Sequence, residues 1–114
     1  MSQLSESKLA ILRRKYGSKL QGRIDRLDQA WRAYDGDASE LHLAHRLTHS
    51  LAGSGASFGY SGVSEAALKL EEIFLAALES GSGIGAAERR RVDELLSRMA
   101  EAGRGPPDEA NPPG

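Results

Sequence analysis

The residues of this chain best suited to nucleophilic attack or metal binding are three histidines, His42, His45 and His49. Their spacing of three and then four residues places them on one face of a helix. Neutral imidazole is a nucleophile near pH 7, and two imidazoles one helical turn apart can chelate Zn²⁺. The chain contains no cysteine, which excludes disulfides, thiolate metal sites and cysteine nucleophiles. Two kinds of histidine chemistry therefore stay open at this point.

Small residues follow His49 in the segment HSLAGSGASFG. Helical spacing places Ala52, Gly53 and Ala56 on the same face as His49, and we expect the imidazole to point to solvent above them. A glycine inside a helix costs roughly 0.5 to 1 kcal/mol relative to alanine. Gly53 and Gly55 therefore need a reason: either another helix packs closely there, or the backbone of a partner approaches.

The elements that must position these residues are helices. Apolar residues recur at spacings of three and four, and β-branched residues are scarce, which predicts an all-α protein. The first apolar stripe runs from Leu9 to Tyr34 and is interrupted at Gly17 and Ser18. This interruption predicts a short N-terminal helix followed by a longer one that has Ser18 as its N-cap.

The histidine helix is expected to begin near Ala38, with Asp37 as its N-cap and Glu40 placed as in a capping box. Gly59 is expected to end it. Its predicted core stripe consists of Ala44, Leu47, Leu51, Ser54 or Gly55, and Phe58.

Two further helices complete the prediction. The next begins after Ser61 as its cap and buries a stripe from Val63 to Leu78. The last buries Val92, Leu95, Leu96 and Met99, and its charge run from Glu88 to Glu94 is interpreted as a solvated face. Short connections favour an antiparallel up-down four-helix bundle, with the short extra helix at the N-terminus. We expect the bundle over residues 1–102 and a disordered Pro/Gly-rich tail over residues 103–114.

The composition excludes several classes of partner. The chain of 114 residues has a formal net charge of −1, so no global field draws it to nucleic acid or to a membrane. No stretch approaches the roughly 20 apolar residues of a membrane span. We expect a cytoplasmic monomer.

The segment HSLAGSGASFG, followed by YSGVSEAALKLEE, resembles the signature of the histidine phosphotransfer (HPt) domain. In that family the segment reads approximately His-x-Leu-Lys-Gly-Ser-Ala-x-x-Phe-Gly, and the helix after it ends in Leu-Glu. The preceding YGSKLQGRIDRLDQAWRAYDGD is similar to the family's second helix. The positions that match the signature are His49, Leu51, Gly53, Ser54, Phe58, Gly59, Leu70 and Glu71.

The resemblance implies a phosphocarrier. His49 would accept a phosphoryl group from the receiver domain of a response regulator, or from a hybrid or CheA-like histidine kinase, and would pass it to a receiver. The receiver would supply Mg²⁺, and the chain would need no cofactor of its own. The sequence has no Walker-type GxxxxGK[ST] segment, so ATP binding and independent kinase activity are not expected, and the chain is interpreted as a carrier and not an enzyme.

One position departs from the family pattern. Three residues after the phosphorylatable histidine the family usually has lysine, whose charge lies near the phosphoryl oxygens, whereas this chain has Ala52. Arg46, one turn before His49, is one substitute. Lys69 is another, because a hairpin of the two helices would place His49 level with about residue 71.

Two alternatives remain. Without the lysine, the chain could be an HPt-like docking module that binds a receiver or kinase without being phosphorylated. A metal site made by the three histidines lacks a fourth ligand and leaves the glycines unexplained. On the surface around His49, we expect His45 to be a rim residue and His42 to be solvated.

Overall fold

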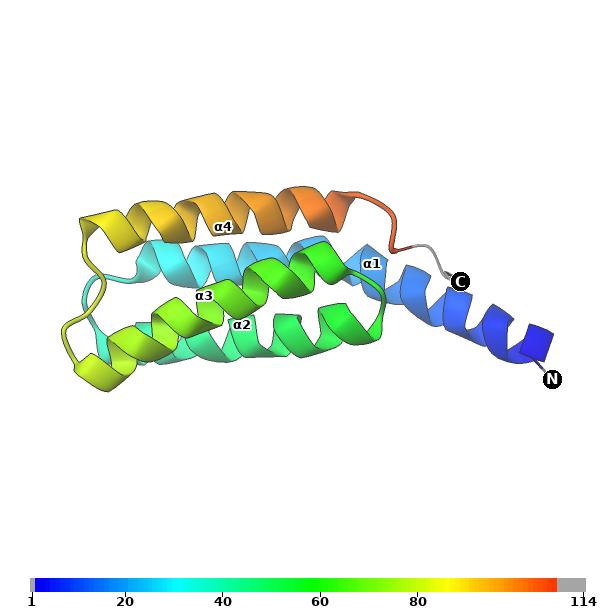
Figure 1. The fold of residues 1–114 in the computed structure, drawn as a ribbon, viewed down its shortest axis with the longest axis horizontal. Coiled ribbons are helices and arrows are strands. Elements are labelled where there is room, and N and C mark those ends of the chain that lie inside the picture. The colour runs from blue at the N-terminus through cyan, green and yellow to red at the C-terminus, as the bar shows by residue number, and fades with distance from the viewer. Residues whose placement is uncertain (1, 109–114) are drawn as a thin grey trace.

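The computed structural model describes residues 2–108, with side chains from residue 8 onward, and these residues form four helices and no strand. The helices are α1 (Ser2–Ala33), α2 (Ala38–Ser57), α3 (Ser61–Ser80) and α4 (Ala86–Arg104). Consecutive helices run in opposite directions (Figure 1). The all-α, four-helix prediction is confirmed, and none of the described helices is long and apolar enough to cross a membrane.

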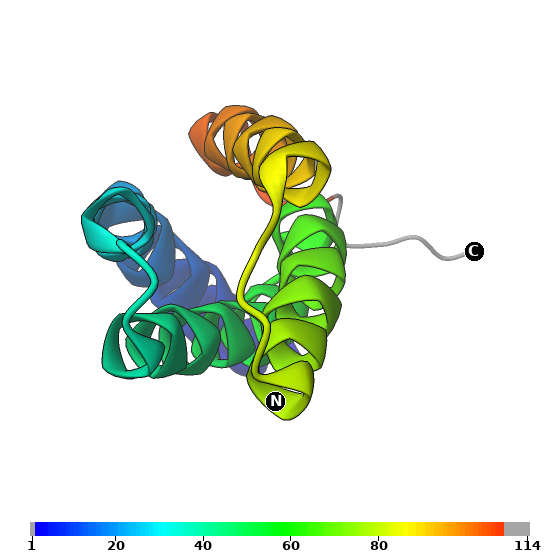
Figure 2. The same ribbon diagram turned by 90° about the vertical axis from the view of Figure 1, so that its left-hand side faces the viewer.

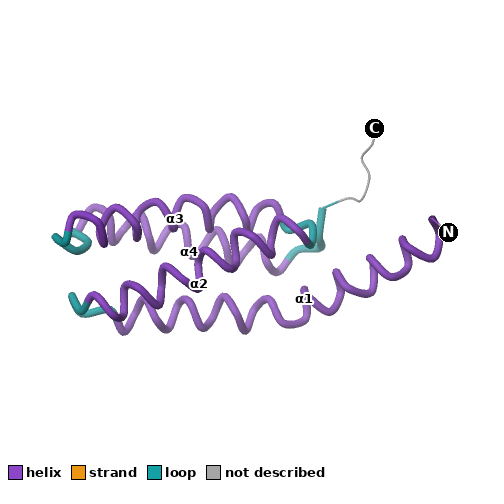
Figure 3. Tube along the Cα trace, turned by 90° about the horizontal axis from the view of Figure 1, so that it is seen from below, coloured by secondary structure: helices purple, strands orange, loops and turns teal. Residues whose placement is uncertain are grey.

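The helix α1 is continuous, so the predicted break at Gly17 and Ser18 is wrong. The Ser18 hydroxyl donates to the Lys15 carbonyl at 2.8 Å, inside the helix, and caps nothing. Gly17 serves packing, because a methyl group at this position would collide with the Tyr60 hydroxyl. The N-terminal turns of α1 extend past the end of the other three helices (Figure 3). There is therefore no separate short helix within the described residues.

The start of α2 follows the prediction in part. The Asp37 carboxylate accepts from the Ser39 backbone N–H at 2.8 Å, and this bond, together with one from the Ser39 hydroxyl, lowers the pKa of Asp37. In a capping box the Glu40 carboxylate would accept from the N–H of Asp37. Here it accepts from the N–H of Asp35 instead, at 3.0 Å. Asp37 is thus the N-cap, while Glu40 holds the turn before it.

The segment after α4 folds back onto the start of α3. The Asp108 carboxylate accepts from the backbone N–H of Ser61 at 3.2 Å and from its hydroxyl at 3.0 Å. The Asp108 N–H donates to the Gly59 carbonyl at 2.6 Å. Ser61, which we predicted as the cap, is instead the first helical residue. The helix α4 continues to Arg104, past the predicted boundary at residue 102, and Asp108 contacts the start of α3. Residues 109–114 lie outside the described part of the chain.

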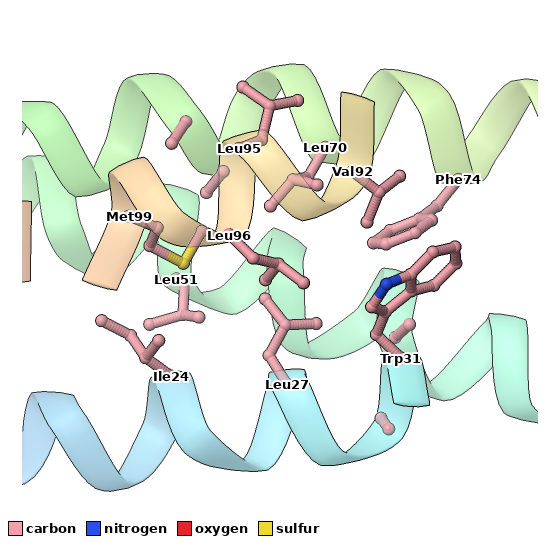
Figure 4. Packing of buried hydrophobic residues seen from close by; sticks show 14 of the residues in the cluster. Ile24, Leu27, Trp31, Leu51, Leu70, Phe74, Val92, Leu95, Leu96 and Met99 are labelled. Carbon is pink, nitrogen blue, oxygen red and sulfur yellow. The ribbon is translucent and has the colours of Figure 1, made fainter. Parts of the chain in front are cut away.

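The core fills the space between the helices with aliphatic and aromatic side chains (Figure 4). Trp31 packs against Phe74 with their ring centroids 5.9 Å apart. The Trp31 indole N–H donates to Asp93 at 2.8 Å, and the Arg89 guanidinium lies 5.6 Å from the centre of the indole ring. The charge run of α4, which we interpreted as a solvated face, therefore also joins α4 to α1.

The buried face of α2 differs from the predicted stripe. Leu51 and Gly55 are buried as expected, but Leu47 is only partly buried, whereas Thr48 and Ala52 are buried. The cause is that α2 lies beside both α1 and α3 and packs most extensively on α3 (Figure 2). This packing places one edge of the histidine-bearing face of α2 beside α3, while His42 and His49 remain exposed.

Candidate functional site

His49 lies on the outer surface of α2, and its side chain is 72% exposed. The next turn of the helix leaves the ring uncovered, because Gly53 is exposed and a methyl group built there would touch nothing within 4 Å. The structure thus confirms that the imidazole points to solvent and that the surface beside it is open.

A carboxylate from α3 holds the imidazole. The Oε2 atom of Glu71 lies 2.5 Å from the Nδ1 atom of His49. This contact confirms that His49 lies level with residue 71 in the α2–α3 hairpin. An anionic acceptor favours the tautomer in which Nδ1 carries the proton, so the Nε2 lone pair is left free toward solvent. Glu71 was part of the matched signature but not of the predicted site. The expected hairpin, which places His49 level with about residue 71, was the signal that could have identified Glu71 as a site residue.

His45 lies one turn before His49 and is much less exposed, at 23% of its side chain. The two rings are nearly parallel, with centroids 6.4 Å apart and planes inclined by 20°. The Nε2 atom of His45 lies 3.7 Å from the same Glu71 oxygen that His49 contacts, which exceeds hydrogen-bond length. This nitrogen is shielded from solvent and has no hydrogen-bond partner among the described residues. One carboxylate therefore faces both imidazoles.

The small residues divide between surface and core. We expected Ala52 on an exposed face with Gly53 and Ala56, and this is wrong for Ala52, which is only 6% exposed. Gly53 and Ala56 are exposed as expected. The Ala52 carbonyl accepts from the Ser64 hydroxyl of α3 at 2.8 Å. The position at which the family usually has lysine thus lies at the α2–α3 interface.

The two cations proposed as substitutes lie on different sides of the bundle. Arg46 is exposed on α2, one turn before His49. Lys69 lines a groove between α3 and α4 together with Arg98 and Ala102. Positions 69 and 71 lie about 200° apart around a helix, so the face of α3 that carries Glu71 turns away from Lys69. The structure therefore brings Arg46, but not Lys69, to the His49 side.

Two exposed leucines of α3 belong to this surface and were missed. Leu68 and Leu75 are 53% and 43% exposed, and they lie one turn to either side of Glu71. Together with Glu72 they line a shallow groove at Glu71. The signal was present in the sequence, because neither leucine fits the buried stripe predicted from Val63 to Leu78.

The third histidine, His42, lies apart from the two that face Glu71. His42 is exposed on α2, one turn further from Glu71 than His45. Within the described part of the chain, no group of three or more histidine, aspartate or glutamate side chains is arranged to hold a metal ion.

Comparison with protein families matches residues 12–103 to the Hpt domain. Comparisons with curated proteins and with solved structures found no match. The family match includes all of α2 and α3, and with them His49 and Glu71. Domains of this family are phosphocarrier modules of two-component phosphorelays, and they interact with response-regulator receivers or histidine kinases. Because the match spans most of the sequence and the fold is the helical bundle that it requires, the chain belongs to the Hpt domain family.

Proposed function

We propose that the protein carries a phosphoryl group on His49, either between two receiver domains or from a histidine kinase to a receiver. The observation that supports this most directly is the His49–Glu71 pair: an exposed imidazole whose Nδ1 atom is occupied by a carboxylate, so that Nε2 is the free nucleophile. The surface beside the ring is open at Gly53, which permits close approach of a second protein.

The proposed transfer begins when Nε2 of His49 attacks the phosphorus atom of an aspartyl phosphate in line with the bond to be broken. The N–P bond forms, and the aspartate oxygen leaves with the electron pair of the P–O bond. The ring gains positive charge, which the Glu71 carboxylate stabilises through Nδ1–H. In the onward step a receiver aspartate attacks phosphorus, and the N–P electron pair returns to the imidazole.

The Mg²⁺ needed for this transfer is proposed to belong to the receiver. Among the described residues, Glu71 is the carboxylate that contacts His49, and it already accepts a hydrogen bond from the ring, so the carrier's site does not fit a resident Mg²⁺ ion. The part left to this chain is to present and orient the nucleophile. The cytoplasmic location and the monomeric state stay predictions from the sequence.

The proposed docking surface spans α2 and α3 around His49 and includes Leu68 and Leu75. Exposed leucines that flank a reactive group are suited to the apolar centre of an interface. We expect Leu68→Glu to weaken binding to a receiver domain, measured by titration calorimetry. Leu43→Glu is the matched control, because Leu43 is an exposed leucine that lies about 120° around α2 from His49. Equal losses for both variants would contradict this placement of the surface.

The function itself is tested by incubating the protein with a phosphorylated receiver, or with a histidine kinase and ATP. We expect an acid-labile, base-stable phosphoryl group that is lost in His49→Gln and kept in His42→Gln and His45→Gln. Labelling that survives His49→Gln would overturn the assignment.

A second candidate is a docking module that binds a receiver or kinase without being phosphorylated. It is favoured by the buried Ala52 methyl group at the position where the family usually has a lysine charge. Receiver binding without labelling by any donor would establish this candidate in place of the first.

A further inference from the structure

The environment of His45 is unusual for a residue at the edge of a docking surface. Its Nε2 atom is shielded from solvent and makes no hydrogen bond within the described residues. A buried donor or acceptor without a partner costs free energy, so such a group needs a structural reason. The polar atom that faces it is Oε2 of Glu71, 3.7 Å away.

The charge of Glu71 determines which form of His45 fits this place. A lone pair on Nε2 would point at a carboxylate and be repelled, whereas an N–H in the same position is attracted. A carboxylate oxygen has capacity for two hydrogen bonds, and His49 uses one of them. A hydrogen bond from His45 Nε2–H to Glu71 would satisfy the shielded nitrogen, and it requires the two atoms to approach by about 0.5 Å.

We propose that His45 is a positioning residue for phosphoryl transfer, and that it acts through Glu71. By holding the carboxylate from the buried side, His45 keeps it on Nδ1 of His49 and prevents it from turning out to solvent. This inference rests on the proposed function of His49 as the phosphoryl acceptor, and it adds a residue that acts on His49 through Glu71.

The proposal has a direct consequence for the nucleophile. An imidazole without a fixed partner exchanges between two tautomers, and only the one protonated at Nδ1 leaves Nε2 free to attack. If His45 restrains Glu71, loss of His45 shifts His49 away from this tautomer. The fraction of reactive His49 then falls, and the transfer rate falls with it.

The first measurement is the tautomeric state of His49, read from long-range ¹H–¹⁵N correlation spectra of the ¹⁵N-labelled protein. We expect His45→Leu to reduce the population protonated at Nδ1 and to slow acquisition of the phosphoryl group from a phosphorylated receiver roughly three- to tenfold, the size expected for one lost hydrogen bond. His45→Gln keeps an N–H donor of similar reach, so it should restore most of both. His42→Leu is the matched control, because His42 lies on the same face of α2, one turn further from Glu71.

The second measurement is a double-mutant cycle. Once Glu71→Gln has removed the charge through which His45 acts, His45→Leu should have little further effect on the tautomer or on the rate. The proposal is overturned if His45→Leu leaves the His49 tautomer unchanged, or if the two effects simply add. Thermal unfolding of each variant checks that the bundle is intact, and His45→Gln covers the case in which leucine disturbs it.

The tautomer measurement needs no phosphoryl donor. It therefore separates the two ideas: absence of labelling by any donor would refute the proposed function, whereas an unchanged tautomer in His45→Leu would refute the positioning role of His45.

Discussion

Glu71 gives an exposed imidazole a defined orientation. Most of the His49 side chain is in solvent, where a ring without a partner would rotate freely, but its Nδ1 atom contacts a carboxylate that is itself only 19% exposed. The carboxylate belongs to α3 and the imidazole to α2, so the geometry of the site depends on how these two helices pack.

The contribution of this carboxylate can be tested by Glu71→Gln. Glutamine keeps the shape and can still accept from Nδ1–H, but it carries no charge to stabilise the ring as the N–P bond forms. We expect phosphoryl transfer to slow roughly tenfold, because hydrogen bonds to charged groups are about twice as strong as neutral ones. The rate is measured with a phosphorylated receiver as donor. Glu65→Gln is the control, because Glu65 is an exposed carboxylate of α3 that lines the other groove, together with Lys69. Equal slowing in both variants would show that general surface charge, and not the Glu71 contact, matters.

The role of the cations gives a second prediction for single residues. Arg46 lies on the His49 side of the bundle, whereas Lys69 lines the groove between α3 and α4. We therefore expect Arg46→Glu to slow transfer severalfold, since charge–charge terms of this size are usual near a phosphoryl group. Lys69→Glu should have no larger effect than Arg90→Glu, a charge reversal on the exposed face of α4. A stronger effect of Lys69→Glu than of Arg46→Glu would mean that Lys69 reaches the phosphoryl group in the complex.

The nucleophile could be predicted from sequence, but part of its surroundings could not. The motif and the spacing identified His49, and the expected hairpin of the two helices placed residue 71 beside it. The burial of Ala52 could not be read from periodicity, because the rotation of α2 about its axis is set by its packing on α3. The same rotation explains why His45 is partly buried, although it lies only one turn from the exposed His49.

At the scale of the elements, the two helical glycines of α2 have different reasons. A methyl group at Gly55 would lie 3.3 Å from both the Ser64 nitrogen and the Tyr60 carbonyl oxygen. These two backbone atoms are hydrogen-bonded to each other at 3.0 Å, so neither can move away easily. Gly53 has no neighbour within 4 Å. The first glycine permits close packing of α2 and α3, and the second leaves room on the proposed docking surface.

This difference predicts opposite effects of the same substitution. Gly53→Ala should raise the free energy of unfolding by about 0.5 to 1 kcal/mol, because alanine favours the helix and meets no obstacle. Gly55→Ala should lower it by roughly 1 kcal/mol, because overpacking against backbone outweighs that gain. Urea unfolding measures both. If Gly53 serves docking, Gly53→Ala should also weaken receiver binding despite its greater stability; destabilisation by both substitutions would contradict the assignment of Gly53 to open surface.

The helices could be predicted from the sequence, except where a glycine could either end a helix or permit close packing inside one. Gly59 has φ +83° and ends α2 as predicted. Gly17 lies inside α1, and we interpreted it as a break because local sequence carries no sign of Tyr60, a residue far along the chain, packing against it. A glycine that ends a helix can be recognised from the turn residues around it. A glycine that permits close packing depends on contacts that only the tertiary fold supplies.

At the scale of the whole molecule, the end of the described chain completes the bundle. Tyr60 is the N-cap residue of α3, and its side chain makes no capping bond. Asp108 provides this bond from the other end of the sequence, through the N–H and hydroxyl of Ser61. A negative side chain at a helix N-terminus is also favoured by the helix dipole. The C-terminal segment thus takes part in the hairpin that carries both His49 and Glu71.

The capping role of Asp108 can be measured by comparing two shortened chains. A chain that ends after residue 108 keeps the carboxylate, whereas one that ends after residue 104 loses it together with the Asp108 N–H bond to Gly59. We expect the shorter chain to be less stable in urea unfolding by about 1 kcal/mol, the usual contribution of a side-chain cap. Asp108→Ala in the full chain should reproduce most of this loss, because the cap is one side chain.

Equal stability of the two shortened chains would show that the cap adds nothing and that α3 begins without it. Transfer by the shorter chain should remain close to that of the longer one, since the cap lies about three turns of α3 away from Glu71.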